Sequence, residues 1–80
     1  MKKDIYVRRK WEEENIIIYL HFIGENAVRQ MEVFPNKVVK ISKNNPISED
    51  SYLYDQNFSD IKWDESDFIS EDEFNEKWNT

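Results

Sequence analysis

One stretch of the chain is far more apolar than the rest, and it constrains the fold more than any other feature. Residues 16–23 read Ile-Ile-Ile-Tyr-Leu-His-Phe-Ile, a β-branched and aromatic composition that is typical of strands. The run ends at Gly24-Glu25-Asn26, where Gly and Asn tolerate the positive φ values of a hairpin turn. The sequence therefore predicts a central strand that is partly buried on both faces.

Three further strands are predicted around this one. Residues 4–11 alternate between apolar and charged side chains with the period of two expected of an outer strand. Residues 27–34 form a third strand, and Pro35-Asn36-Lys37 then turns the chain into a fourth at 38–43. Because the connections are short, the economical topology is an antiparallel meander over residues 1–43.

Residues 44–69 are predicted to be an acidic loop region. Asn44-Asn45-Pro46 is a turn signal, and no strand or helix period follows it over a useful length. Two local features are expected inside the region. They are a short helical turn after Ser59 and a brief extended piece at residues 67–69.

A C-terminal helix is predicted over residues 70–79. Ser70 and Glu73 have the spacing of a capping box, and Phe74 and Trp78 lie four residues apart on one helical face. We therefore predict one domain over residues 1–80 with an α+β fold. A four-stranded antiparallel sheet carries the helix on one face, and a fifth short strand remains an alternative.

Composition excludes several classes of function. The 80 residues include no Cys and one Gly, which leaves no thiolate chemistry and no glycine-rich phosphate loop. So short a chain also has little interior for a deep substrate pocket. We expect a non-catalytic protein with no catalytic residue, no metal site and no cofactor. Without an apolar run long enough to span a bilayer, we expect no membrane contact and a cytoplasmic location.

Charge is distributed unevenly along the chain. Residues 1–47 hold nine Lys or Arg and six Asp or Glu, whereas residues 48–80 hold two and eleven. An acidic surface repels nucleic acid and attracts basic proteins, so we expect a basic protein partner and no direct binding of nucleic acid. Solubility alone is an equally good explanation of the acidic half.

The acidic and aromatic stretch from Ser48 to Asp72 is where we place the partner-binding surface. Carboxylates give steering and register, while Tyr and Trp are the residues most often found as binding hot spots. The predicted binding residues are Tyr52, Tyr54, Asp55, Asp60, Trp63, Asp64, Glu65 and Asp67. The alternative is a solvated acidic face whose three rings fold into the core.

Other constellations favour structural interpretations. His21 is the one imidazole, and its place on a strand favours a structural role over catalysis. The Asp64-Glu65-x-Asp67 cluster lacks the spacing of a calcium loop, although a small metal-dependent hydrolase built on it remains an alternative. The basic run Arg8-Arg9-Lys10 is expected to pair with the acidic C-terminal segment of the same chain.

Three short motifs resemble one family. They are Ile69-Ser70-x-x-Glu73-Phe74-x-x-x-Trp78, the N-terminal strand closing on Trp11, and Arg29-x-x-Glu32-Val33-Phe34 before a tight turn. They resemble a family of small bacterial domains associated with toxin immunity proteins. Where that family often has Asp-Gly after the third strand, this chain has Pro35-Asn36.

The resemblance implies a sheet-and-helix fold and a binding role. We therefore expect an inhibitor that blocks the basic active site of a cognate toxin, with a nuclease as the expected target. One alternative is a DNA-mimic inhibitor of a host defence nuclease encoded by a mobile element. Another is a small acidic accessory domain with no separate activity.

Overall fold

A computed structural model describes residues 3–44, 47–48 and 51–79. Two members of the acidic stretch, Glu49 and Asp50, and the turn residues Asn45 and Pro46 lie outside the described residues. The strands are β1 (Asp4–Trp11), β2 (Ile16–Ile23), β3 (Asn26–Val33), β4 (Val38–Ser42), β5 (Ile47–Ser48) and β6 (Ser51–Tyr52). Two 3₁₀ turns, η1 (Phe58–Asp60) and η2 (Glu65–Asp67), precede the helix α1 (Glu71–Trp78).

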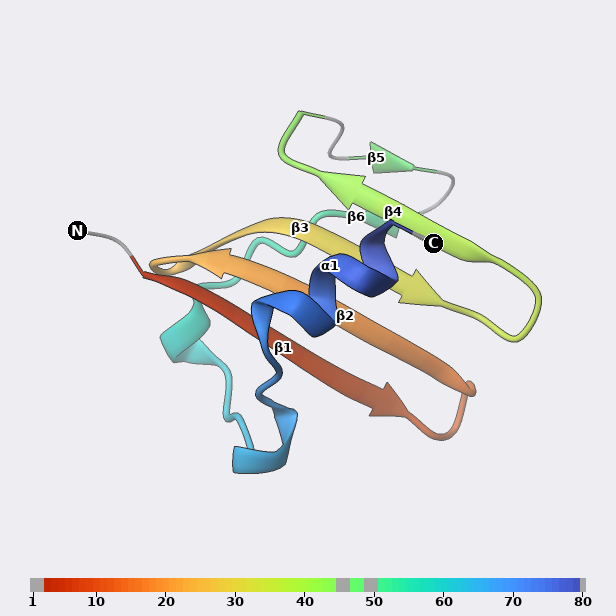
Figure 1. Ribbon diagram of the computed structural model, residues 1–80, viewed down its shortest axis with the longest axis horizontal. Coiled ribbons are helices and arrows are strands. Elements are labelled where there is room, and N and C mark those ends of the chain that lie inside the picture. The colour runs from red at the N-terminus through yellow and green to blue at the C-terminus, as the bar shows by residue number, and fades with distance from the viewer. Residues whose placement is uncertain (1–2, 45–46, 49–50, 80) are drawn as a thin grey trace.

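The first four strands form one antiparallel sheet in the order β1-β2-β3-β4, which confirms the predicted α+β meander (Figure 1). Asn15 and Gly24 take positive φ values of 55° and 62° in the first two turns. Both are residue types that enter this region at low cost. The pairing of β2 with β3 shifts between His21 and Phe22, leaving Val28 as an extra residue on β3.

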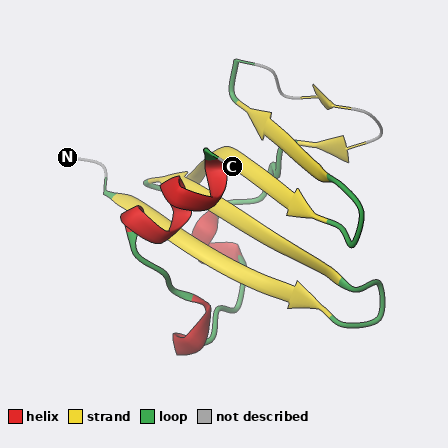
Figure 2. Ribbon diagram, turned by 45° about the vertical axis from the view of Figure 1, so that its right-hand side comes forward, coloured by secondary structure: helices red, strands yellow, loops and turns green. Residues whose placement is uncertain are grey.

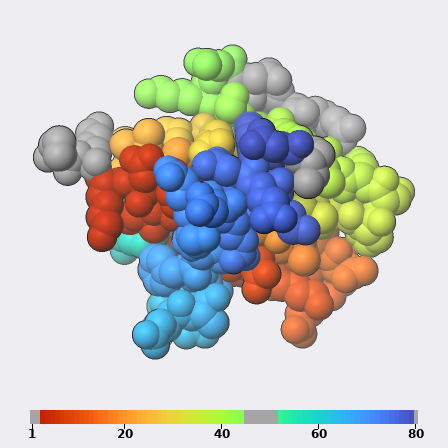
Figure 3. All heavy atoms as spheres, viewed as in Figure 1, coloured from red at the N-terminus to blue at the C-terminus, as the bar shows by residue number. Residues whose placement is uncertain are grey.

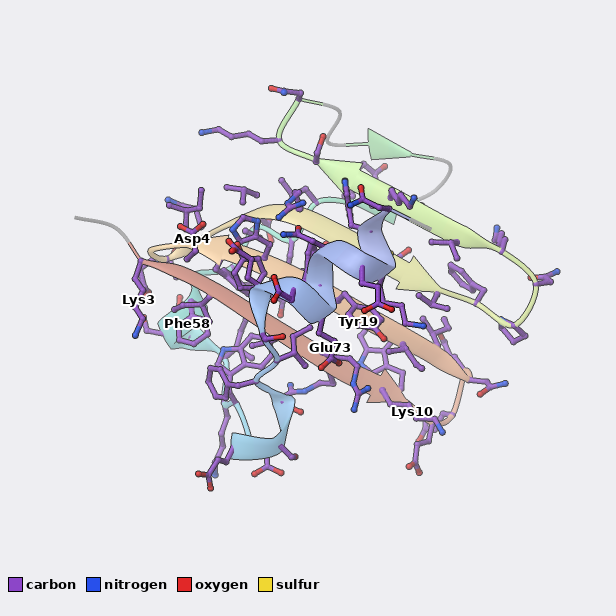
Figure 4. The ribbon with its side chains drawn as sticks, in the orientation of Figure 1. Lys3, Asp4, Lys10, Tyr19, Phe58 and Glu73 are labelled. Atoms are coloured by element: carbon purple, nitrogen blue, oxygen red, sulfur yellow. The ribbon has the colours of Figure 1, made fainter. Side chains whose placement is uncertain are left out.

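The helix covers one face of the sheet (Figures 1 and 3). Ser70 caps it, because its hydroxyl accepts a hydrogen bond from the Glu73 amide at 3.1 Å. Phe74 is fully buried against Tyr6, Tyr19 and Met31, and Trp78 packs at the edge of this cluster. Tyr19 is labelled beneath α1 in Figure 4. The predicted helix, docked through two rings, is confirmed. Of the predicted capping box only the bond to the Ser70 hydroxyl is present, and the Glu73 carboxylate pairs with Arg8 instead.

The region predicted as an acidic loop forms a second cover, on the opposite face of the sheet. Four of its side chains are partly buried and pack against Val7, Leu20 and Phe22 of the sheet. These four are Leu53, Phe58, Ile61 and Trp63. Figures 1 and 2 show the chain passing behind the sheet, on the side away from α1. With both faces covered, the central strand β2 has five buried residues out of eight.

The second cover is fixed at both ends. At one end, Glu25 accepts hydrogen bonds from the amide and hydroxyl of Ser59, and its carbonyl accepts from the Phe58 amide at 2.9 Å. At the other, Phe68 makes an isolated antiparallel bridge to Val7 on the outer strand β1. The expected helical turn is present as η1, which contains Ser59 rather than following it. The expected extended piece is reduced to the bridge at Phe68, because Asp67 ends the 3₁₀ turn η2. The small β5–β6 hairpin was not predicted.

Candidate functional site

A groove of about 230 Å³ opens on the face of the sheet opposite α1. The sheet contributes the apolar side chains of Val7, Trp11, Ile18 and Leu20. The second cover adds Tyr52, Tyr54, Ile61 and Trp63. Polar groups come from Arg9, Gln30 and Glu32. We call these eleven residues the aromatic groove, because four of them carry aromatic rings.

Three of these rings are accessible to a partner. The exposed fractions are 67% for Tyr52, 50% for Trp11 and 37% for Tyr54. Rings exposed beside an apolar groove are unusual in a chain with so little apolar surface to spare. The alternative prediction is that the three rings of the acidic stretch, Tyr52, Tyr54 and Trp63, fold into the core. It is wrong for Tyr52 and Tyr54.

Trp63, the third predicted ring, is held in place by the protein. Its ring stacks on Phe58 with centroids 5.6 Å apart, and its indole N–H donates to the Phe58 carbonyl at 3.1 Å. The guanidinium of Arg9 lies over the same ring, 4.7 Å from its centroid. Trp63 is therefore a rigid wall of the groove and also part of the second cover.

A buried amide ties the second cover to the sheet at the groove. Gln30, on β3, is 4% exposed, and its carbonyl oxygen accepts from the Tyr54 backbone amide at 2.9 Å. Its amide nitrogen donates to Glu32 at 3.1 Å. Loss of these bonds would leave a buried amide unsatisfied, so the position of Tyr54 is well determined. Alternation along the third strand placed Gln30 on a face, but no sequence signal connected it with Tyr54.

The predicted acidic residues fall into two groups. Asp55, Asp60 and Glu65 are exposed. Asp64 is exposed but caps η2, accepting from the Glu65 amide at 2.8 Å. Asp67 completes this capping box by accepting from the Asp64 amide at 2.9 Å.

Asp67 also pairs with the outer strand. Its carboxylate lies 2.7 Å from Arg9 Nη2, and its side chain is only 15% exposed. Burial works against the charge, but hydrogen bonds from the Asp64 amide and Arg9 hold the pKa of Asp67 below its ordinary value. A second pair, Arg8 with Glu73 at 3.8 Å, joins β1 to the helix. The predicted pairing of the basic strand with the acidic C-terminal segment is confirmed.

A polar cluster surrounds His21 beneath α1. His21 is 6% exposed, and its Nδ1 accepts from Arg29 Nε at 2.9 Å, which places the ring hydrogen on Nε2, 3.3 Å from Asp4. Arg29 in turn donates to Asn75 on the helix at 3.1 Å. Burial and the positive charge of Arg29 lower the pKa of His21. Asp4 is labelled in Figure 4.

Tyr6 extends the same cluster. Its ring stacks on His21 with centroids 4.3 Å apart, and its hydroxyl donates to Glu71 at 2.9 Å. Burial first, and then the negative acceptor Glu71, raise the pKa of Tyr6 to about 12. Both nitrogens of His21 are engaged by protein groups, so the cluster joins the sheet to the helix. The structural interpretation of His21 agrees with this geometry.

Searches for similar proteins add no further guide. A scan against protein-family models, a search of curated proteins and a search of solved structures each found no match. Within the described ranges, His, Asp and Glu side chains do not gather in the groups of three that would hold a metal ion. No helix in the described part of the chain is long and apolar enough to cross a bilayer.

Proposed function

We propose that this chain is a non-catalytic inhibitor that binds a basic protein, in the manner of a bacterial immunity protein that blocks a toxin nuclease. The observation that carries the proposal is the composition of one short segment. Between residues 52 and 65 it exposes the rings of Tyr52 and Tyr54 together with the carboxylates of Asp55, Asp60 and Glu65. The resemblance of three short motifs to immunity proteins supports the same role.

These two kinds of side chain do different work at an interface. Exposed carboxylates raise the rate of encounter with a positively charged surface and fix its orientation. Aromatic rings beside an apolar groove supply most of the binding energy once solvent is removed. A nuclease binds phosphates in a basic groove, and a protein that covers this groove with carboxylates stops the reaction without chemistry of its own.

The first experiment identifies the partner and then measures the association rate. Affinity capture at low and moderate salt, from the bacterium that encodes the chain, should retain one basic protein whose binding weakens as salt rises. The purified partner is then assayed for nuclease activity with and without the chain. A captured defence nuclease, rather than a toxin, would favour the DNA-mimic alternative.

Charge reversal tests the surface itself. We expect Asp55→Lys with Asp60→Lys to slow association about tenfold at low salt, because both carboxylates lie on the proposed surface. The control is matched in charge, because Asp60→Lys alone is compared with Glu76→Lys, an exposed position of α1 outside the acidic stretch from Ser48 to Asp72. Melting curves verify that each variant folds. Equal association rates for the two single variants would contradict the proposed surface.

A further inference from the structure

The aromatic groove has the size and surroundings of a socket for one side chain. We propose that it receives an aliphatic side chain, such as leucine, from a segment of the partner that carries Lys or Arg on both sides of that anchor. This inference rests on the proposed function and names the part of the partner that the site recognises. It assigns to the groove the recognition of an apolar side chain, which the negative charge of the surface does not explain.

The volume argues for a side chain rather than a cofactor. At about 230 Å³, the groove lies below the roughly 300–1,000 Å³ of typical small-molecule pockets. Its apolar lining suits an aliphatic group, and Ile18 and Leu20 on the central strand lie among the lining residues. An inserted leucine would touch the rings of Trp11 and Trp63 and lose its contact with water.

The charge around the groove selects a basic segment. Trp11 lines both the groove and a neighbouring hollow, whose other lining residues are Lys10 and the three glutamates 12–14, so a turn with an excess of negative charge adjoins one end. Glu32 lies in the lining itself. Three further carboxylates are sequence neighbours of residues that line the groove. Asp55 follows Tyr54, Asp60 precedes Ile61 and Asp64 follows Trp63.

The positive charge in the same region is smaller, and much of it is engaged. Arg9 lines the groove, but its guanidinium bonds Asp67 at 2.7 Å and the Lys62 carbonyl at 2.8 Å. Two further cations lie nearby, Lys62 between two lining residues and Lys10 in the neighbouring hollow, and they are outnumbered by the carboxylates named above. A second copy of the chain, with its formal net charge of −6, would be repelled by this rim. Charge complementarity therefore favours a basic segment as the occupant.

The walls are preformed, which lowers the cost of binding. Tyr54 is held through its amide by Gln30, and Trp63 through its indole by the Phe58 carbonyl. Tyr52 lies on β6, which pairs with β5. Because Tyr54 and Trp63 are held before the partner arrives, less conformational entropy is lost on insertion of the anchor.

Two synthetic peptides test the proposal on the full chain. The first is acetyl-Lys-Lys-Leu-Lys-Lys-amide, and the second has Ser in place of Leu. Each is titrated into the isotope-labelled protein at low salt and followed by two-dimensional NMR. We expect the leucine peptide to shift the indole signals of Trp11 and Trp63 and to bind at least about tenfold more tightly than the serine peptide.

Two variants locate the binding. Tyr52→Ala removes an exposed wall of the groove and should weaken the leucine peptide about fivefold or more. Val38→Ala truncates another exposed apolar side chain, one on β4 that does not line the groove, and should leave affinity unchanged. If the leucine peptide binds Tyr52→Ala as tightly as the parent, the assignment of the groove is wrong.

The remaining outcomes separate the two proposals. Equal affinity for both peptides, with shifts confined to carboxylate-bearing residues, would overturn the socket and leave the acidic surface as a binding site. Shifts from neither peptide would also overturn the socket, while capture of the partner would still decide the proposed function. Sedimentation showing a dimer that Tyr52→Ala dissociates would give the groove to a second copy and overturn the inference.

Discussion

Phe74 is the residue whose removal should cost the fold most. Its side chain is fully buried. The centroid of its ring lies 5.4 to 6.5 Å from the ring centroids of Tyr6, Tyr19, His21 and Trp78. Truncating a buried Phe to Ala costs about 3–5 kcal/mol, through lost burial and the cavity that remains. A domain of this length is stable by roughly 4–12 kcal/mol, so Phe74→Ala should remove a large part of the total.

The matched control is Phe68→Ala, which deletes the same side chain at a position that is 47% exposed. We expect it to cost about 1 kcal/mol, because much of the ring already contacts water. Urea denaturation followed by circular dichroism gives both free energies of unfolding. Phe74→Ala should also lower the melting temperature by roughly 15–30 °C. If the two variants differ by less than about 1 kcal/mol, docking of α1 does not depend on Phe74 as argued.

Two titrations test the polar cluster beneath α1. Because the pKa of His21 is lowered on folding, the unfolded chain binds its proton near the ordinary value of 6.5 while the folded chain does not. The free energy of unfolding should therefore be constant with respect to His21 above pH 6.5 and should decrease as the pH falls below 6.5. A melting temperature that is unchanged down to about pH 5.5 would contradict this. In ultraviolet absorbance titration one phenol should ionise near pH 12 and be missing from Tyr6→Phe. If Tyr6→Phe instead removes a phenol that ionises near pH 10, burial and Glu71 do not raise the pKa of Tyr6.

The sheet and the helix could be predicted because their signals are local. Apolar alternation marks the outer strand, and the turn at Gly24 lies between two apolar stretches. Phe74 and Trp78 have helical spacing directly after a capping residue. Each of these features arises from neighbours within a few residues, so no knowledge of distant contacts is needed.

The second cover could not be predicted, because its apolar residues follow no single period. Leu53, Phe58, Ile61 and Trp63 are spaced by five, three and two residues along loops and a 3₁₀ turn. Tertiary contacts decide where such residues point. The bond from the Tyr54 amide to Gln30 likewise joins residues 24 apart in the chain. Of the predicted site, Tyr52 and Tyr54 are exposed, while Asp67 is mainly an internal partner of Arg9.

The second cover places buried and exposed side chains close together in the sequence. Phe58 and Ile61 face the sheet and complete the core, whereas Asp55 and Asp60 beside them are exposed. Mutations at the exposed positions of such a segment cost little stability, because they remove neither burial nor a satisfied hydrogen bond. Under the proposed function, the charge pattern and the exposed ring of Tyr52 can therefore change while the core stays the same. The same separation makes the charge-reversal experiment informative, since a slower association rate there reports on the surface and not on unfolding.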